Sequence, residues 1–180
     1  MSGGYEKELE EIEEIGSKFE DYKSHRAIEL ASKCIKDGQM EIALSLLEHD
    51  NLSIRTGAAE ALSKYHIENE NWDGVKQLLQ SDDNGAWNGS YWALYEFITI
   101  KCSSIDKLHD IGILLEASLR EWSNSKPRAL NIQRQYQEAV SDLLIDIGEK
   151  IKHLDKGKRF SDLEWKRPRN SVNKKRKNRY

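Results

Sequence analysis

A pattern that returns after 32 residues is the feature that most constrains the fold of this 180-residue chain. It consists of a leucine pair, a turn that contains aspartate, a glycine and an alanine–leucine pair. The matching residues are Leu46, Leu47, Asp50, Gly57, Ala61 and Leu62 in the first copy and Leu78, Leu79, Asp82, Gly89, Ala93 and Leu94 in the second. A repeat of this length, built from two helices, buries its apolar face only by stacking on its neighbours. The pattern therefore predicts a helical solenoid.

The composition favours an all-α protein of one folded domain. The chain has two prolines, and charged residues make up 33% of it. Its apolar runs are too short to span a membrane, and its first residues lack a secretory signal, so we expect a cytoplasmic protein, or a nuclear one in a eukaryote. Cys34 and Cys102 lie far apart within predicted helices, which favours two buried thiols over a disulfide.

The apolar spacing predicts eight helices in four antiparallel pairs, the last pair long enough to cap the stack. Their ranges are 5–22, 24–36, 40–48, 51–66, 72–80, 86–100, 105–122 and a last helix from Pro127 to about residue 155. In the first helix a single stripe runs through Leu9, Ile12, Ile15, Phe19 and Tyr22, and in the last helix the inward set is Ile132, Tyr136, Ala139, Val140, Leu143 and Ile147. Asp50 or Asn51 can cap the fourth helix.

The second helices of the two repeat units share one inward-facing pattern. It reads small, small, leucine, aromatic at positions i, i+3, i+4 and i+7: Ala58, Ala61, Leu62 and Tyr65, then Ser90, Ala93, Leu94 and Phe97. The small residues allow neighbouring helices to approach closely, and the larger ones fill the space behind them.

This pattern resembles the second helix of a HEAT-type repeat. Asp50, Ile54 and Arg55 stand where such repeats have aspartate, valine and arginine, and the alanines and Leu62 follow. The resemblance is good over residues 40–66 and partial over residues 72–98. It implies a right-handed HEAT-like solenoid in which an Asp–Arg ladder runs along the stack. Trp87 replaces the second arginine, so we expect the ladder to be interrupted there.

Trp92 occupies the position that Glu60 holds in the preceding unit, outside the predicted inward set. A tryptophan that faces solvent is unusual, and Asn88 and Tyr95 share its helix face. In HEAT-like repeats the second helices line the concave, ligand-holding surface, and Trp and Tyr dominate interface hot spots. The predicted partner-binding residues are Asn88, Trp92, Tyr95, Arg55 and Trp87. The alternative is that the terminal helices cover the aromatic residues as core.

No catalytic signature is present in the sequence. The five histidines are scattered, and there is no glycine-rich phosphate loop and no Cys/His metal cluster. We therefore predict a non-enzymatic interaction module with no cofactor and no metal, which binds a protein partner on its concave face. One enzymatic alternative comes from resemblance alone: some DNA-repair glycosylases use HEAT-like repeats with tryptophans and an aspartate, which Trp87, Trp92 and Asp83 resemble.

Charge divides the chain into an acidic body and a basic end. Residues 156–180 contain eleven basic and two acidic side chains, a net charge of +9, whereas residues 1–155 contain 17 basic and 29 acidic ones, a net charge of −12. We predict a domain over residues 1–155 and a disordered basic tail over residues 156–180. The tail is predicted to add electrostatic attraction for the protein partner.

The basic tail also supports a second function, association with RNA or DNA, for instance within a ribonucleoprotein. The residues predicted to contact nucleic acid are Arg167, Arg169, Lys174, Lys175, Arg176, Lys177 and Arg179. Three other roles fit the same residues: a nuclear-targeting signal, a solubilising end, and a strap that folds onto the acidic body.

Overall fold

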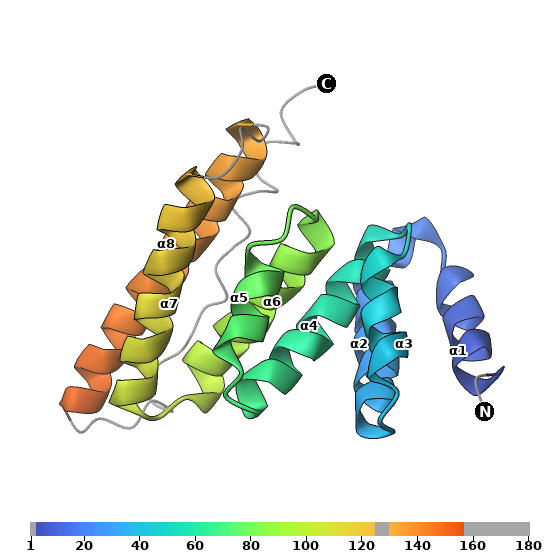
Figure 1. The fold of residues 1–180 in the computed structure, drawn as a ribbon, viewed down its shortest axis with the longest axis horizontal. Helices are drawn as coiled ribbons and strands as arrows, with labels where there is room; N and C mark the ends of the chain where they lie inside the picture. Colours follow the sequence, from blue (N-terminus) through green and yellow to red (C-terminus); the bar gives the residue numbers. More distant parts are fainter. Residues whose placement is uncertain (1–2, 125–129, 157–180) are drawn as a thin grey trace.

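Figure 1 shows the computed structural model of the protein, which describes residues 3–124 and 130–156. These two ranges contain helices and turns but no β-strand, so the prediction of an all-helical fold is confirmed. The helices succeed one another along the long axis of the molecule. They begin with α1 (Gly3–Glu13) at one end and finish with α7 (Ile105–Asn124) and α8 (Leu130–Asp155) at the other.

Three helices pack one on the next through the middle of the molecule. These are α2 (Glu20–Lys36), α4 (Leu52–Glu68) and α6 (Asn84–Glu96), in which α4 lies between the other two. Shorter helices connect them: α3 (Met40–Ser45) with the 3₁₀ turn η2 (Leu46–Glu48), and α5 (Trp72–Leu79). Helix α6 then contacts α8, and α5 contacts α7.

Two groups of buried side chains form the core and meet at α4. One joins α1, α2, α3 and the first part of α4, and the other joins the end of α4 to α5, α6, α7 and α8. Leu62 and Leu94 are each 0% exposed, as the repeat pattern predicts. Cys34 and Cys102 are buried free thiols, which confirms that they form no disulfide with each other.

Gly57 and Gly89, which are 32 residues apart, are the points of closest approach between the stacked helices. A Cβ atom at Gly57 would lie 2.7 Å from the Cβ of Ala27 on α2, and closer still to a backbone carbonyl oxygen. A Cβ atom at Gly89 would lie 2.6 Å from the backbone nitrogen of Glu60 on α4. Both spaces are too small for a methyl group, so the repeated glycine sets the spacing of α2, α4 and α6.

The predicted first helix, residues 5–22, is wrong. Helix α1 ends at Glu13, and a 3₁₀ turn η1 (Ser17–Phe19) leads into α2 at Glu20. The apolar stripe therefore breaks: Ile12 is buried, whereas the side chains of Phe19 and Tyr22 are 63% and 52% exposed. Spacing alone could not reveal the break, because Gly16 permits a turn without interrupting the apolar period.

The two short connecting helices bury different members of their leucine pairs. In α5, Val75 and Leu79 are buried, four residues apart, as in an α-helix. In the other unit Ala43 and Leu46 are buried, only three residues apart, because the chain tightens into η2 with three residues per turn. The matching leucines therefore do not hold matching places in the core.

Helix α6 continues into a π-helical turn, η3 (Phe97–Lys101), which frees carbonyl groups at its end. The buried Lys150 of α8 donates hydrogen bonds from its Nζ to the carbonyl oxygens of Ile98 and, at 3.2 Å, Thr99. Burial lowers the pKa of Lys150, while the negative end of the helix dipole favours its ammonium form. Lys150 thus joins α8 to the end of α6.

The last helix agrees with its predicted inward face. Leu108, Ile111 and Leu115 of α7 are buried, and so are four of the α8 residues predicted to face inward: Tyr136, Val140, Leu143 and Ile147. Pro127 lies outside the described residues, as does the predicted tail after residue 156. None of the helices in the described ranges combines the length and the apolar character needed to cross a membrane.

Replacing Gly57 or Gly89 with alanine is expected to destabilise the protein by about 1–3 kcal/mol, because the added methyl group meets backbone atoms of the adjacent helix. Gly112 of α7 supplies the matched control, since a Cβ there meets no atom within 4 Å. Gly112→Ala should stabilise the protein by up to about 1 kcal/mol through helix propensity. Urea unfolding measures all three variants, and equal effects at the three positions would contradict the close-approach account.

Candidate functional site

The starts of α4 and α6 are built in the same way, 32 residues apart. The side chain of Asn51 accepts hydrogen bonds from the backbone N–H groups of Ser53 and Ile54 at 2.9 and 3.3 Å. Asp83 caps α6 equivalently, with Oδ1 accepting from Gly85 and Ala86 at 2.8 and 2.9 Å. The predicted cap of the fourth helix is confirmed and belongs to Asn51.

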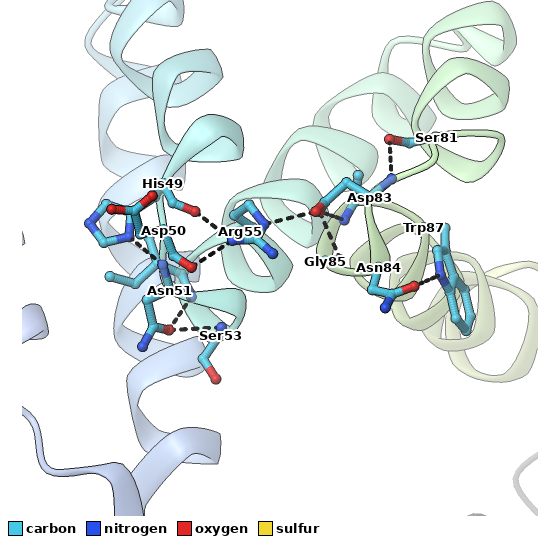
Figure 2. Close-up of polar contacts among 12 residues, drawn as sticks. His49, Asp50, Asn51, Ser53, Arg55, Ser81, Asp83, Asn84, Gly85 and Trp87 are labelled. Carbon is cyan, nitrogen blue, oxygen red and sulfur yellow. Dashed lines mark hydrogen bonds and ion pairs between the residues drawn. The ribbon is translucent and has the colours of Figure 1, made fainter. Parts of the chain in front are cut away.

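Arg55 links the cap of α6 to the turn that precedes α4, as Figure 2 shows. Its Nε donates to Oδ2 of Asp83 at 2.9 Å, and its Nη1 donates to the carbonyl oxygens of His49 and Asp50 at 2.6 and 2.8 Å. A partly buried guanidinium with three acceptors is a charge-assisted junction between consecutive units. Arg55 therefore has a connecting role within the chain.

Trp87 stands where a second arginine would extend this junction. Its indole N–H donates to Asn84 Oδ1 at 3.2 Å within the same helix end (Figure 2). Its ring meets the ring of Tyr136 on α8 edge to face, with centroids 6.1 Å apart. The ion pair between Arg55 and Asp83 is therefore not repeated at the next position. Trp87 instead makes an aromatic contact with Tyr136 of α8.

Further along α6, three aromatic rings lie in mutual contact. Trp92 meets Tyr91 and Tyr95 nearly perpendicularly, with centroids 5.2 and 5.8 Å apart, and Tyr91 and Tyr95 are nearly parallel at 6.3 Å. Trp92 and Tyr95 are half-buried, while Tyr91 is only 9% exposed. Trp92 is therefore neither fully exposed nor fully part of the core, and its role in binding stays a prediction.

Asp142 and Asp146 lie on α8, which contacts α6, and their charges act on Tyr91. Burial, together with the smaller effect of the charges of Asp142 and Glu149, raises the pKa of Asp146 to about 6. Burial also raises the pKa of Tyr91 to about 12, with contributions from Asp142 and Asp146. The carboxylates therefore lie within electrostatic reach of the Tyr91 hydroxyl. We call Tyr91, Trp92, Tyr95, Asp142 and Asp146 the aromatic–acidic patch.

The structure brings together only part of the predicted binding set. Trp92 and Tyr95 share the patch, and Asn88 is half-buried one turn before Trp92. Arg55 and Trp87 lie at the helix starts and have no ring contact or hydrogen bond with the patch. Sequence reasoning missed Tyr91, although its spacing of four from Tyr95 was a signal. It also missed Asp142 and Asp146, whose proximity depends on how α8 packs.

A cavity lies between α7 and α8. This cavity of about 260 Å³ has a mainly apolar lining that includes Leu108, Ile113 and Ile147, and two glycines, Gly112 and Gly148, leave it open. None of the predicted binding residues lines it.

The described residues include no group of three or more side chains suited to hold a metal ion. The predicted nucleic-acid-contacting residues Arg167, Arg169, Lys174, Lys175, Arg176, Lys177 and Arg179 lie outside the described residues. Comparison of the chain with protein-family models, with curated proteins and with solved structures finds no match.

Replacing Asp146 with asparagine is expected to stabilise the protein above about pH 6 by about 1 kcal/mol, a figure reduced for the partial solvation of the side chain. The pKa of Asp146 in the folded protein, about 6, exceeds its ordinary value of 3.8. The folded state therefore binds more protons than the unfolded state between these values, and stability falls as pH rises through that window. Below about pH 4 the advantage of asparagine should vanish, since both states are protonated.

Chemical unfolding at about pH 4 and about pH 7.5 measures this difference. Asp110→Asn, at an exposed position of α7, is the control and should not shift stability with this pH profile. A gain from Asp146→Asn that is the same at both pH values would contradict the assignment to the carboxylate.

Proposed function

We propose that the protein is a HEAT-like, right-handed solenoid of four helix pairs, and that it binds a protein partner through the aromatic–acidic patch on its concave face. Residues 156–180, with a net charge of +9, add electrostatic attraction to an acidic region of the same partner. The succession of α2, α4 and α6, held at a common spacing by Gly57 and Gly89, supports the repeat architecture.

The observation that carries the binding proposal is the aromatic cluster on α6. Trp92 replaces the Glu60 of the preceding unit, and with Tyr95 it keeps part of its ring exposed rather than entering the core completely. Half-buried tryptophan and tyrosine offer a large contact area at low entropic cost, which is why they dominate interface hot spots. In the preceding unit the same face carries the ion pair of Glu60 and Lys64.

Asp83 does not support the glycosylase alternative. Both of its carboxylate oxygens accept hydrogen bonds, one from the start of α6 and the other from Arg55. These contacts give Asp83 a part in joining the repeat units.

Replacing Trp92 or Tyr95 with alanine is expected to weaken partner binding about 30-fold or more, the effect of losing about 2 kcal/mol at a hot spot. The partner is recovered by cross-linking in the native source, and its affinity is then measured with the purified proteins. Phe19→Ala is the matched control, since Phe19 is an aromatic residue that is 63% exposed near the other end of the chain. Lost stability with unchanged affinity in the Trp92 variant would remove the binding proposal.

The charge of residues 156–180 favours association with RNA or DNA as the second candidate function. Affinity for generic RNA and duplex DNA should then fall steeply with salt, and it should fall by at least about tenfold when Lys174, Lys175, Arg176 and Lys177 become glutamine. Filter binding at two salt concentrations measures both effects. Salt-independent binding, or no binding to either nucleic acid, would reject this candidate.

A further inference from the structure

The cavity between α7 and α8 is open because each of the two helices contributes a glycine to its lining. Gly112 of α7 and Gly148 of α8 both line it, and a Cβ atom at either position would meet nothing within 4 Å. Its volume of about 260 Å³ lies below the range of about 300–1,000 Å³ that is usual for small-molecule sites. The cavity therefore suits one or two side chains better than a cofactor.

The apolar lining of this cavity continues to the surface of the molecule. Leu108 and Ile147 are buried, whereas the side chain of Ile113, which lines the same cavity, is 68% exposed. Ile145 of α8 is 60% exposed as well. Exposed apolar side chains beside an open cavity mark a surface that another segment covers.

The chain itself supplies apolar side chains shortly after α8. Residues 157–180 lie outside the described residues, and within them Phe160, Leu163 and Trp165 fall in a stretch of six positions. Lys158 and Arg159 precede this stretch. The sequence thus places three large apolar residues, enclosed by basic ones, next to the helix that forms the cavity.

The length of chain between the cavity and these residues allows them to meet. The start of α7 and the end of α8 lie at the same end of the helix pair (Figure 1), and the cavity is lined from the first part of α7 and the later part of α8. From Gly148 to Lys156 the helix rises about 12 Å. Nine more residues lead to Trp165 and span up to about 30 Å when extended. Gly157 tolerates the backbone conformations that a reversal of the chain requires.

Charge favours this segment over a second copy of the chain. Helices α7 and α8 carry exposed carboxylates at Asp106, Asp110 and Glu149, and residues 156–180 have a net charge of +9. Opposite charges attract the segment to these helices. Two copies of residues 1–155, each with a net charge of −12, would instead repel one another.

We infer that Phe160, Leu163 and Trp165 dock in the cavity between α7 and α8, so that the chain's own segment covers the apolar surface of this helix pair. The inference goes beyond the proposed function and does not depend on a partner. Docking would hold the basic residues from Lys166 onward beside α7 and α8.

Limited trypsin digestion of the full chain tests this contact, because a protease cuts a docked segment only while it is undocked. Cleavage after Arg159 and Lys166, on either side of the apolar residues, should be at least about tenfold slower than in a synthetic peptide of residues 157–180. Cleavage after Lys175 should proceed at the rate seen in the peptide and is the internal reference. Mass spectrometry of the fragments measures these rates. Equal cleavage after Arg159 and Lys166 in chain and peptide would overturn the inference.

One variant on each side of the contact should remove the protection. Gly148→Phe fills the cavity, and Leu163→Asp puts a charge into the apolar stretch. Each should bring cleavage after Arg159 and Lys166 to within about twofold of the rate in the peptide. Thermal unfolding shows whether the Gly148 variant is folded, and Leu163→Asp decides the question alone if it is not. Protection that persists in a folded variant of either kind would overturn the inference.

Each variant has a matched control. Gly4→Phe adds the same side chain on α1, at a position where a Cβ atom also meets nothing within 4 Å. Val172→Asp adds the same charge to the segment outside its apolar stretch. Both controls should keep the protection. An equal loss in Val172→Asp and Leu163→Asp would show attraction by charge alone and overturn the proposed docking.

A second copy of the chain is the competing occupant of the cavity. Docking within one chain predicts the same protection over about a hundredfold dilution, whereas docking between copies weakens by mass action. If protection fades on dilution, and sedimentation shows a dimer that Gly148→Phe dissociates, a second copy covers the cavity and the inference is overturned.

Discussion

The close approach of helices at Gly57 and Gly89 is the constraint on which the rest of the structure depends. At both places the backbone of one helix rests against the backbone or Cβ of the next, with no room for a side chain. This spacing brings Leu62 and Leu94 fully into the core and allows Ser63 and Ser90 to share a buried hydrogen bond at 2.8 Å. The apolar and polar contacts between α4 and α6 thus follow from one backbone distance.

The contacts at the helix starts change from charged to aromatic along the chain. Arg55 and Asp83 connect two consecutive units by a charge-assisted hydrogen bond, but Trp87 takes the next arginine position and meets Tyr136 of α8. An arginine there would need a further capping carboxylate, whereas an aromatic ring needs apolar surface. Helices α7 and α8 are longer than α5 and α6, and their buried apolar side chains supply that surface.

Charge divides the chain into an acidic region and a basic region. Residues 1–155 carry a net charge of −12, while residues 156–180, with a net charge of +9, suit phosphate or acidic protein. A net charge of −3 for the whole chain conceals this division.

The repeat interval, the helical class and the inward positions Ala58, Ala61 and Leu62 were determined by the sequence, because apolar period and small-residue spacing act locally and recur. The caps at Asn51 and Asp83 follow from the same local chemistry. Only the tertiary structure decided that α1 ends at Glu13, that Leu46 rather than Leu47 enters the core, and that Tyr91 of α6 meets the charges of Asp142 and Asp146 on α8. These outcomes depend on how helices distant in sequence pack, and a one-dimensional period carries no information about which helix faces which.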